Sequence, residues 1–215
     1  MYKLYNVKTW GSLAPHCVLE ELGVPYQNIW MTGEQVRDPK FKEISPLGFV
    51  PVLGLPDGRP IVESAAIIAF LTDAHPDKKL APAPGEADHA EYLSSLVFMS
   101  VNLYQMISIL YAPGMLADTD SEKATVGRRA TENVGALFDM IEARLAKEGP
   151  FILGDRFSAA DIYLFMLSLW ARPSEAEHLA RYPHIAKVSA AVRARPKLKA
   201  ALEAHGVMGL GGYGA

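Results

Sequence analysis

The sequence predicts a protein of two halves, an α/β amino-terminal half followed by an all-helical carboxy-terminal half. Three observations lead to this prediction. Residues 1–76 mix short β-type runs with helical ones, whereas beyond residue 88 apolar side chains recur only at helical spacing. Between them, HPDKKLAPAPGEADH gathers prolines and charges, which is typical of a linker. We therefore expect domains over 1–76 and 88–215, joined by a linker over 77–87.

In the amino-terminal half, alternation predicts strands in YKLYNV and YQNIWM, and apolar spacing over 12–22 predicts a helix between them. The runs VPVLGL and RPIV flank Pro56-Asp57-Gly58, a turn signal that joins two antiparallel strands. A further helix follows Ser64. The expected order is β-α-β-α-β-β-α.

In the carboxy-terminal half, residues 93–110 are apolar nearly all round, which predicts a helix buried on more than one side. An amphipathic helix is expected over 122–147. Ser158 and Asp161 have the spacing of a capping box at the start of an apolar core helix. Two short helices split at Pro196 close the chain, and the tail GVMGLGGYGA is too rich in glycine for a stable element.

The amino-acid composition limits the classes of function that the protein can have. The chain has 50% hydrophobic and 21% charged residues, an ordinary globular mix. Its net charge of −3, without a basic block, argues against a nucleic-acid partner. We find no signal peptide and no run long enough to span a bilayer, so we expect a soluble, cytoplasmic protein. A lone cysteine, Cys17, excludes internal disulfide chemistry, and no zinc-binding set is present.

Five motifs in order resemble the glutathione transferase family over the whole chain. They are Val50-Pro51 heading a strand, Glu63-Ser64 before a helix, the linker, the Ser158–Asp161 box and the ending YPHIAKVSAAVRARP. SLAPH near the start is similar to bacterial members, including the beta class. The resemblance implies a thioredoxin-like amino-terminal domain that binds glutathione, a helical domain that shapes the pocket for a second substrate, and a homodimer.

The same resemblance implies how glutathione is held. The Val50–Pro51 bond is expected to be cis, which exposes the Val50 backbone to pair with the cysteinyl part like an added strand. Ser64, at a helix N-terminus, suits the γ-glutamyl carboxylate, and Glu63 the ammonium group. Arg37 is a candidate for the glycyl carboxylate. An edge-strand proline and a plain N-cap serine are the simpler alternatives.

A glutathione enzyme must stabilise a thiolate, because an unperturbed thiol titrates near 8.5. We predict that Ser12, at the N-terminus of the first helix, provides the activating hydroxyl; Tyr5 is the alternative, and a plain N-cap role for Ser12 stays open. Beta-class members carry a cysteine where this chain has Gly11. That difference argues against mixed-disulfide chemistry and for a hydroxyl-assisted thiolate.

The helical half differs from bacterial relatives too, since Tyr104-Gln105 stands where they often have His-Lys. Asn102, Tyr104 and Gln105 are candidates for polar contacts with the ligand, or for ordinary helix packing. Trp10, with Met106, Tyr111 and Met115, is a candidate for an apolar second-substrate pocket, or for ordinary core. The expected function is transfer of the glutathione sulfur to an apolar electrophile. Alternatives are a glutathione-dependent lyase, dehalogenase or isomerase, and a non-enzymatic glutathione-binding stress protein.

Overall fold

The computed structural model describes residues 1–211; residues 212–215, the end of the glycine-rich tail, lie outside the described residues. Within the described part, four strands form one sheet in the order β2-β1-β3-β4. The central strand β1 (Tyr2–Asn6) pairs parallel with β2 (Tyr26–Trp30) and antiparallel with β3 (Val52–Gly54). The edge strand β4 (Pro60–Ile61) pairs antiparallel with β3.

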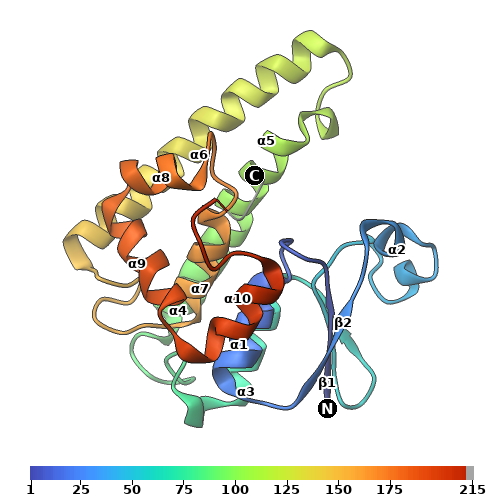
Figure 1. Cartoon of the computed structure of the whole chain (residues 1–215), viewed down its shortest axis with the longest axis vertical. Coiled ribbons are helices and arrows are strands. Elements are labelled where there is room, and N and C mark those ends of the chain that lie inside the picture. Colours follow the sequence, from blue (N-terminus) through green and yellow to red (C-terminus); the bar gives the residue numbers. More distant parts are fainter. Residues whose placement is uncertain (212–215) are drawn as a thin grey trace.

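Helices cover the sheet on both sides (Figure 1). The helices α1 (Leu13–Leu22) and α3 (Ser64–Ala74) lie between the sheet and the helical half, whereas α2 (Gly33–Arg37) lies on the far side of the sheet. The α1 helix ends at Gly23, whose φ of 65° is in the left-handed region that glycine adopts without strain. The order β-α-β-α-β-β-α is the predicted one, and it makes this half thioredoxin-like.

The rest of the described chain is helical, as predicted. Its helices are α4 (His89–Phe98), α5 (Gln105–Tyr111), α6 (Asp120–Glu148), α7 (Ala159–Ser168), α8 (Glu175–Arg181), α9 (Pro183–Arg193) and α10 (Lys199–His205). The α8 helix was not among the elements predicted from the sequence. A local signal was available, because Ser174 accepts a hydrogen bond from the N–H of Glu177 (3.2 Å) as an N-cap.

The predicted helix over 93–110 is longer than expected and is not uniform. A π-helical segment, Met99–Tyr104, joins α4 to α5, so that one rod runs from His89 to Tyr111. This rod is long and apolar enough to cross a membrane by length and composition, contrary to the sequence analysis. Part of it is buried inside the protein, however, and core helices of soluble proteins meet the same criterion. Length and composition alone therefore give weak support for a membrane location.

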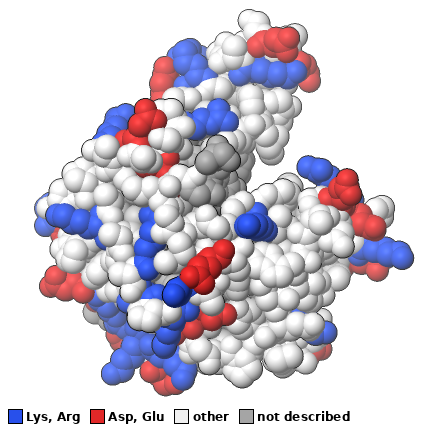
Figure 2. Space-filling model, viewed as in Figure 1, with Lys and Arg blue, Asp and Glu red and all other residues white. Residues whose placement is uncertain are grey.

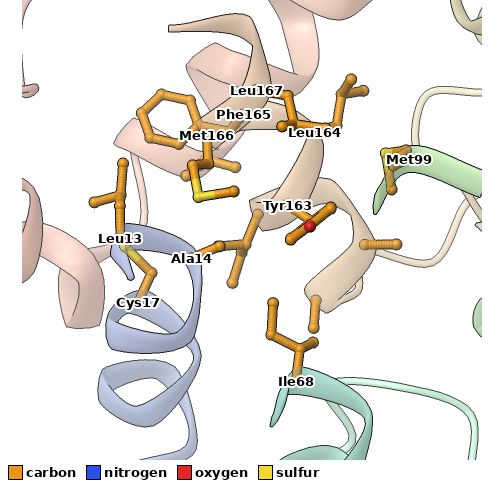
Figure 3. Packing of buried hydrophobic residues seen from close by; sticks show 14 of the residues in the cluster. Leu13, Ala14, Cys17, Ile68, Met99, Tyr163, Leu164, Phe165, Met166 and Leu167 are labelled. Carbon is orange, nitrogen blue, oxygen red and sulfur yellow. The ribbon is translucent and has the colours of Figure 1, made fainter. Parts of the chain in front are cut away.

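The α7 helix forms the centre of the core, and every residue in it is buried. Figure 3 shows Leu13, Ala14 and Cys17 of α1 and Ile68 of α3 around residues 163–167 of this helix. The predicted capping box begins it: the N–H of Ser158 donates to Asp161 (2.8 Å). Because α7 packs against both α1 and α3, it fixes the helical half against the amino-terminal half.

The linker and the start of the tail are packed onto this frame. Leu80 and Ala81 are buried, and the carbonyl of Leu80 accepts a hydrogen bond from the N–H of Ala159 (2.9 Å). Val207, in the described part of the tail, is fully buried. The α/β elements end with α3 and the helical half begins with α4, while the exact boundaries 76/77 and 87/88 stay predictions.

Candidate functional site

A cavity of about 620 Å³ lies between the two halves. Its amino-terminal wall consists of the turn before α1, the loop 45–51 and residues 62–64 at the start of α3. Its other wall is one face of the α4–α5 rod, together with Trp170 just after α7. Figure 2 shows the surface hollowed between the arm formed by α5 and α6 and the lobe that carries α2.

The loop before β3 brings a peptide backbone to the cavity. The Val50–Pro51 bond is cis, as the resemblance implied, and both residues are buried in the cavity wall. The strand β3 begins only at Val52, opposite Tyr5 of β1. Within residues 1–211 the backbone of Val50 forms no loop or turn hydrogen bond. Val50 therefore offers a donor and an acceptor to which an extended peptide can pair.

Glu63 and Ser64 form the polar end of the cavity, at the start of α3. Glu63 has a φ of 68°, a left-handed conformation that costs about 1–3 kcal/mol in a residue other than glycine. The hydroxyl of Ser64 lies 2.8 Å from that of Tyr163, and burial raises the pKa of this tyrosine, which stays neutral. The N-terminus of an 11-residue helix behind Ser64 favours an anion here.

The turn over residues 7–12 is held from the helical half. Thr9 has a φ of 68°, its N–H donates to Nδ1 of His205 (2.9 Å), and its carbonyl accepts from Nε1 of Trp170 (3.1 Å). Burial lowers the pKa of His205 to about 3, so the imidazole is neutral at pH 7 and can accept this bond. The turn presents Trp10 and Gly11 to the cavity.

The structure does not bring Ser12 or Tyr5 to this cavity. Ser12 is fully buried; its hydroxyl accepts from the N–H of Val7 (3.1 Å) and donates to the carbonyl of Val7 (3.2 Å). The ring of Tyr5 lies in a separate small cluster against Phe41, with 5.7 Å between ring centroids. The catalytic role of these two hydroxyls stays a prediction without support from the cavity geometry.

Tyr104, the last residue of the π-helical segment, lines the cavity, and so do Gln105 and Tyr111 of α5. Such segments are frequent at functional sites. The extra residue in the turn changes which side chains lie on a given face of the helix. The ring of Tyr104 packs against Trp170 at 4.9 Å between centroids. The hydroxyl of Tyr111 donates to the carbonyl of Trp170 (3.0 Å).

Two other predicted contacts are not brought to the cavity. Arg37 is the exposed last residue of α2, on the side of the sheet away from the helical half, so the arrangement does not support its predicted contact with glutathione. Met106 is partly buried and packs against the main core, and its sulfur accepts from Asn133 of α6 (3.9 Å). Met115, in contrast, lines the cavity as expected.

Several lining residues were missed. The loop residues Leu47 and Phe49 are more than 60% exposed and apolar, yet no motif marks them. Trp170 ends a run of apolar residues that indicates core, and only the fold places it beside the turn of Thr9. Within residues 1–211, no group of three or more His, Cys, Asp or Glu side chains is placed to hold a metal ion.

Comparisons with known proteins agree with this geometry. Residues 12–74 match the N-terminal domain model of glutathione S-transferase, and residues 105–205 match the C-terminal domain model. A sphingomonad glutathione S-transferase, solved in complex with glutathione, is 31% identical (TM-score 0.80; 95% of this chain and 99% of that one covered).

Two further relatives cover nearly the whole chain. The crystal structure of a glutathione transferase from Methylococcus capsulatus is 29% identical, with a TM-score of 0.82 over 96% of this chain and 100% of that one. The glutathione S-transferase GstA of Escherichia coli O157:H7 is 28% identical over 91% of this chain and 94% of its own length. The chain therefore belongs to the glutathione S-transferase family.

Proposed function

We propose that this protein is a glutathione transferase that binds glutathione in the cavity and transfers its sulfur to an apolar, electrophilic small molecule. One observation carries the proposal: a single cavity joins a polar end, at Val50 and residues 63–64, to an apolar end along α5. A peptide thiol and an apolar electrophile bound at the two ends are held close together, which lowers the entropic barrier to their reaction.

The cysteinyl and γ-glutamyl parts of glutathione each have a partner in the polar end. The cysteinyl backbone pairs with Val50, whose N–H and carbonyl form no loop or turn hydrogen bond within residues 1–211. The γ-glutamyl carboxylate lies at the N-terminus of α3 beside Ser64, and the ammonium group faces Glu63. The sphingomonad relative was solved with glutathione, which supports the same ligand here.

The apolar end suits an aromatic or otherwise apolar second substrate. The apolar side chains that line the cavity include Leu47, Phe49, Ile107, Tyr111 and Met115. A volume of about 620 Å³ falls in the range of roughly 300–1,000 Å³ that small-molecule sites occupy. The physiological role in this proposal is detoxification in the cytoplasm, where thiols are kept reduced.

The binding experiment is calorimetry with glutathione on the wild type and two serine variants. Ser64→Ala should weaken binding about fivefold, the effect of losing about 1 kcal/mol of hydrogen bonding. The matched control is Ser168→Ala, another buried serine, whose hydroxyl donates to the carbonyl of Leu164 (2.9 Å) away from the cavity; it should bind like wild type. Folded wild type that gives no heat with millimolar glutathione would refute the proposal.

A substrate panel with product masses separates the reactions that one thiolate permits. A sulfur-linked conjugate supports the transferase; loss of a leaving group without a retained conjugate indicates a lyase or dehalogenase; an unchanged mass indicates an isomerase. Binding of glutathione without turnover of any electrophile would instead support the non-enzymatic stress protein.

We also propose that the protein is a homodimer. Apolar side chains that are more than half exposed occur on the outside of the helical half, at Val97, Val101 and Met140. Exposed apolar patches of this kind mark association surfaces in soluble proteins. Light scattering coupled to size-exclusion chromatography should give twice the chain mass of 23.5 kDa, and a monomer would contradict the proposal.

A further inference from the structure

Gly11 and Tyr104 meet in the wall of the cavity. A Cβ atom added to Gly11 would lie 2.2 Å from the hydroxyl oxygen of Tyr104 and 3.1 Å from its Cζ atom. Both separations are shorter than van der Waals contact, so only glycine fits at this position while Tyr104 keeps its place. The tyrosine hydroxyl therefore occupies the space that a side chain of residue 11 would fill.

The surroundings hold the Tyr104 ring in this position. It packs against Trp170 at 4.9 Å between centroids, and the indole of Trp170 donates to the carbonyl of Thr9 (3.1 Å), two residues before Gly11. The hydroxyl of Tyr111 donates to the Trp170 carbonyl (3.0 Å). The hydroxyl of Tyr104 is thus placed before a ligand arrives, as electrostatic stabilisation of a developing charge requires.

Position 11 is also where a thiolate-stabilising group is needed. It lies just before α1, in the same cavity wall as Val50, to which the cysteinyl part of glutathione pairs in the proposed complex. The hydroxyl of Ser12 is turned away into the bonds with Val7. The phenol of Tyr104, from the helical half, occupies the space next to Gly11, where the amino-terminal half has no side chain.

We propose that the hydroxyl of Tyr104 stabilises the glutathione thiolate, and that Gly11 is the residue that admits it. The inference rests on the proposed function, because it needs glutathione in the cavity. The bound thiol loses its proton to solvent, and the Tyr104 O–H donates a hydrogen bond to the sulfur anion. An unperturbed phenol is a weaker acid than an unperturbed thiol, so the thiol is the group that ionises.

In the transfer step, a sulfur lone pair attacks the electrophilic carbon. With chlorodinitrobenzene as probe, the new carbon–sulfur bond forms and the carbon–chlorine bond breaks. Chloride leaves with the bonding electron pair. The phenol keeps its proton throughout, and no oxidant or reductant is consumed.

The test is Tyr104→Phe, which keeps the ring and its packing against Trp170 but removes the hydroxyl. A hydrogen bond to a charged group is worth about 1.5–3 kcal/mol, so the thiolate absorbance and kcat/KM, both measured at a pH below the wild-type pKa of the bound thiol, should fall about ten- to hundredfold. The acidic limb of the pH–rate profile should move upward by about one to two pH units. Glutathione affinity at a pH well below the wild-type pKa of the bound thiol, where the sulfur is protonated in both proteins, should change less than about threefold, because the Val50 and Ser64 contacts remain.

The matched control is Tyr92→Phe. Tyr92 lies on the same rod, and its hydroxyl bonds to that of Thr72 (3.1 Å) in the core, outside the cavity. This variant should keep the wild-type pH profile. Gly11→Ala should reproduce the shift of Tyr104→Phe, because the added Cβ displaces the hydroxyl, and the two changes combined should shift the profile no further than Tyr104→Phe alone.

Two results would overturn the inference: an unshifted profile in Tyr104→Phe, or a shift in Tyr5→Phe in its place. Failure of the proposed function is seen separately and earlier, in wild-type calorimetry, because a protein that binds no glutathione gives no heat before any variant is made.

Discussion

The replacement Ser12→Ala tests whether this serine serves the turn or the ligand. The Ser12 hydroxyl forms two buried hydrogen bonds, from the N–H of Val7 (3.1 Å) and to its carbonyl (3.2 Å). Ser12 is fully buried and Val7 is 7% exposed, so water cannot replace the lost hydroxyl readily. An unsatisfied buried polar group costs about 1–3 kcal/mol, and the variant should therefore lose about 2–3 kcal/mol of unfolding free energy.

For a chain of this size, that loss lowers Tm by about 4–12 °C. Urea titration and thermal melting at one fixed protein concentration measure it, since a dimer's stability depends on concentration. Ser121→Ala is the control, because this serine is exposed in the first turn of α6 and should change stability by less than about 0.5 kcal/mol.

The activity of Ser12→Ala should be measured well below its Tm. If the hydroxyl serves the turn, the pH–rate profile keeps its acidic limb although stability falls. A variant as stable as wild type that loses more than about a hundredfold in kcat/KM would refute this reasoning, since it would show that the hydroxyl acts on the thiol.

Two further predictions follow. Burial lowers the pKa of three histidines below the usual 6.5, to about 4, 4 and 3 (His16, His178 and His205). Between about pH 6.5 and 4 these histidines are protonated in the unfolded chain but not in the folded one, so the free energy of unfolding should fall as the pH drops through this range. Burial raises the pKa of Asp161 to about 6, which has the opposite effect. The net loss of unfolding free energy is about 2–3 kcal/mol per pH unit near pH 5. A urea midpoint that stays constant between pH 7 and about 4.5 contradicts the prediction. Glu63→Gly should add about 1 kcal/mol of stability by relieving the positive φ, and should weaken glutathione binding in calorimetry; unchanged affinity would exclude the contact with the ammonium group.

Local pattern predicted most of the fold because each element carries its own signal. The Pro56-Asp57-Gly58 turn and the Ser158–Asp161 box act through hydrogen bonds between residues that are close in the sequence. The strands on either side of the turn and the helix that follows the box are present. The failures lie where tertiary contacts decide. Nothing local distinguishes a uniform helix from one with a π-helical segment at Met99–Tyr104.

The residues of the candidate site could be predicted where the conformation of the backbone places them in the cavity. They could not be predicted where the direction of a side chain decides whether it reaches the cavity. Val50 and Ser64 reach the cavity because a cis bond and a helix start place them there. Arg37 does not line the cavity, and its predicted contact stays a prediction, because the sequence of α2 does not indicate on which side of the sheet the helix lies.

The sequence by itself determined the order of the elements, because this order follows from local periodicity, turns and caps. Its resemblance to a known family indicated the family and the residues that offer backbone groups to a peptide. Only the tertiary structure decided which hydroxyl faces the cavity. Tyr104 and Gly11 are 93 positions apart in the chain, and their contact exists only because the helical half packs against the turn before α1. The folded turn also determines the direction of the Ser12 hydroxyl, because the backbone of Val7 is the buried polar partner with which it forms hydrogen bonds.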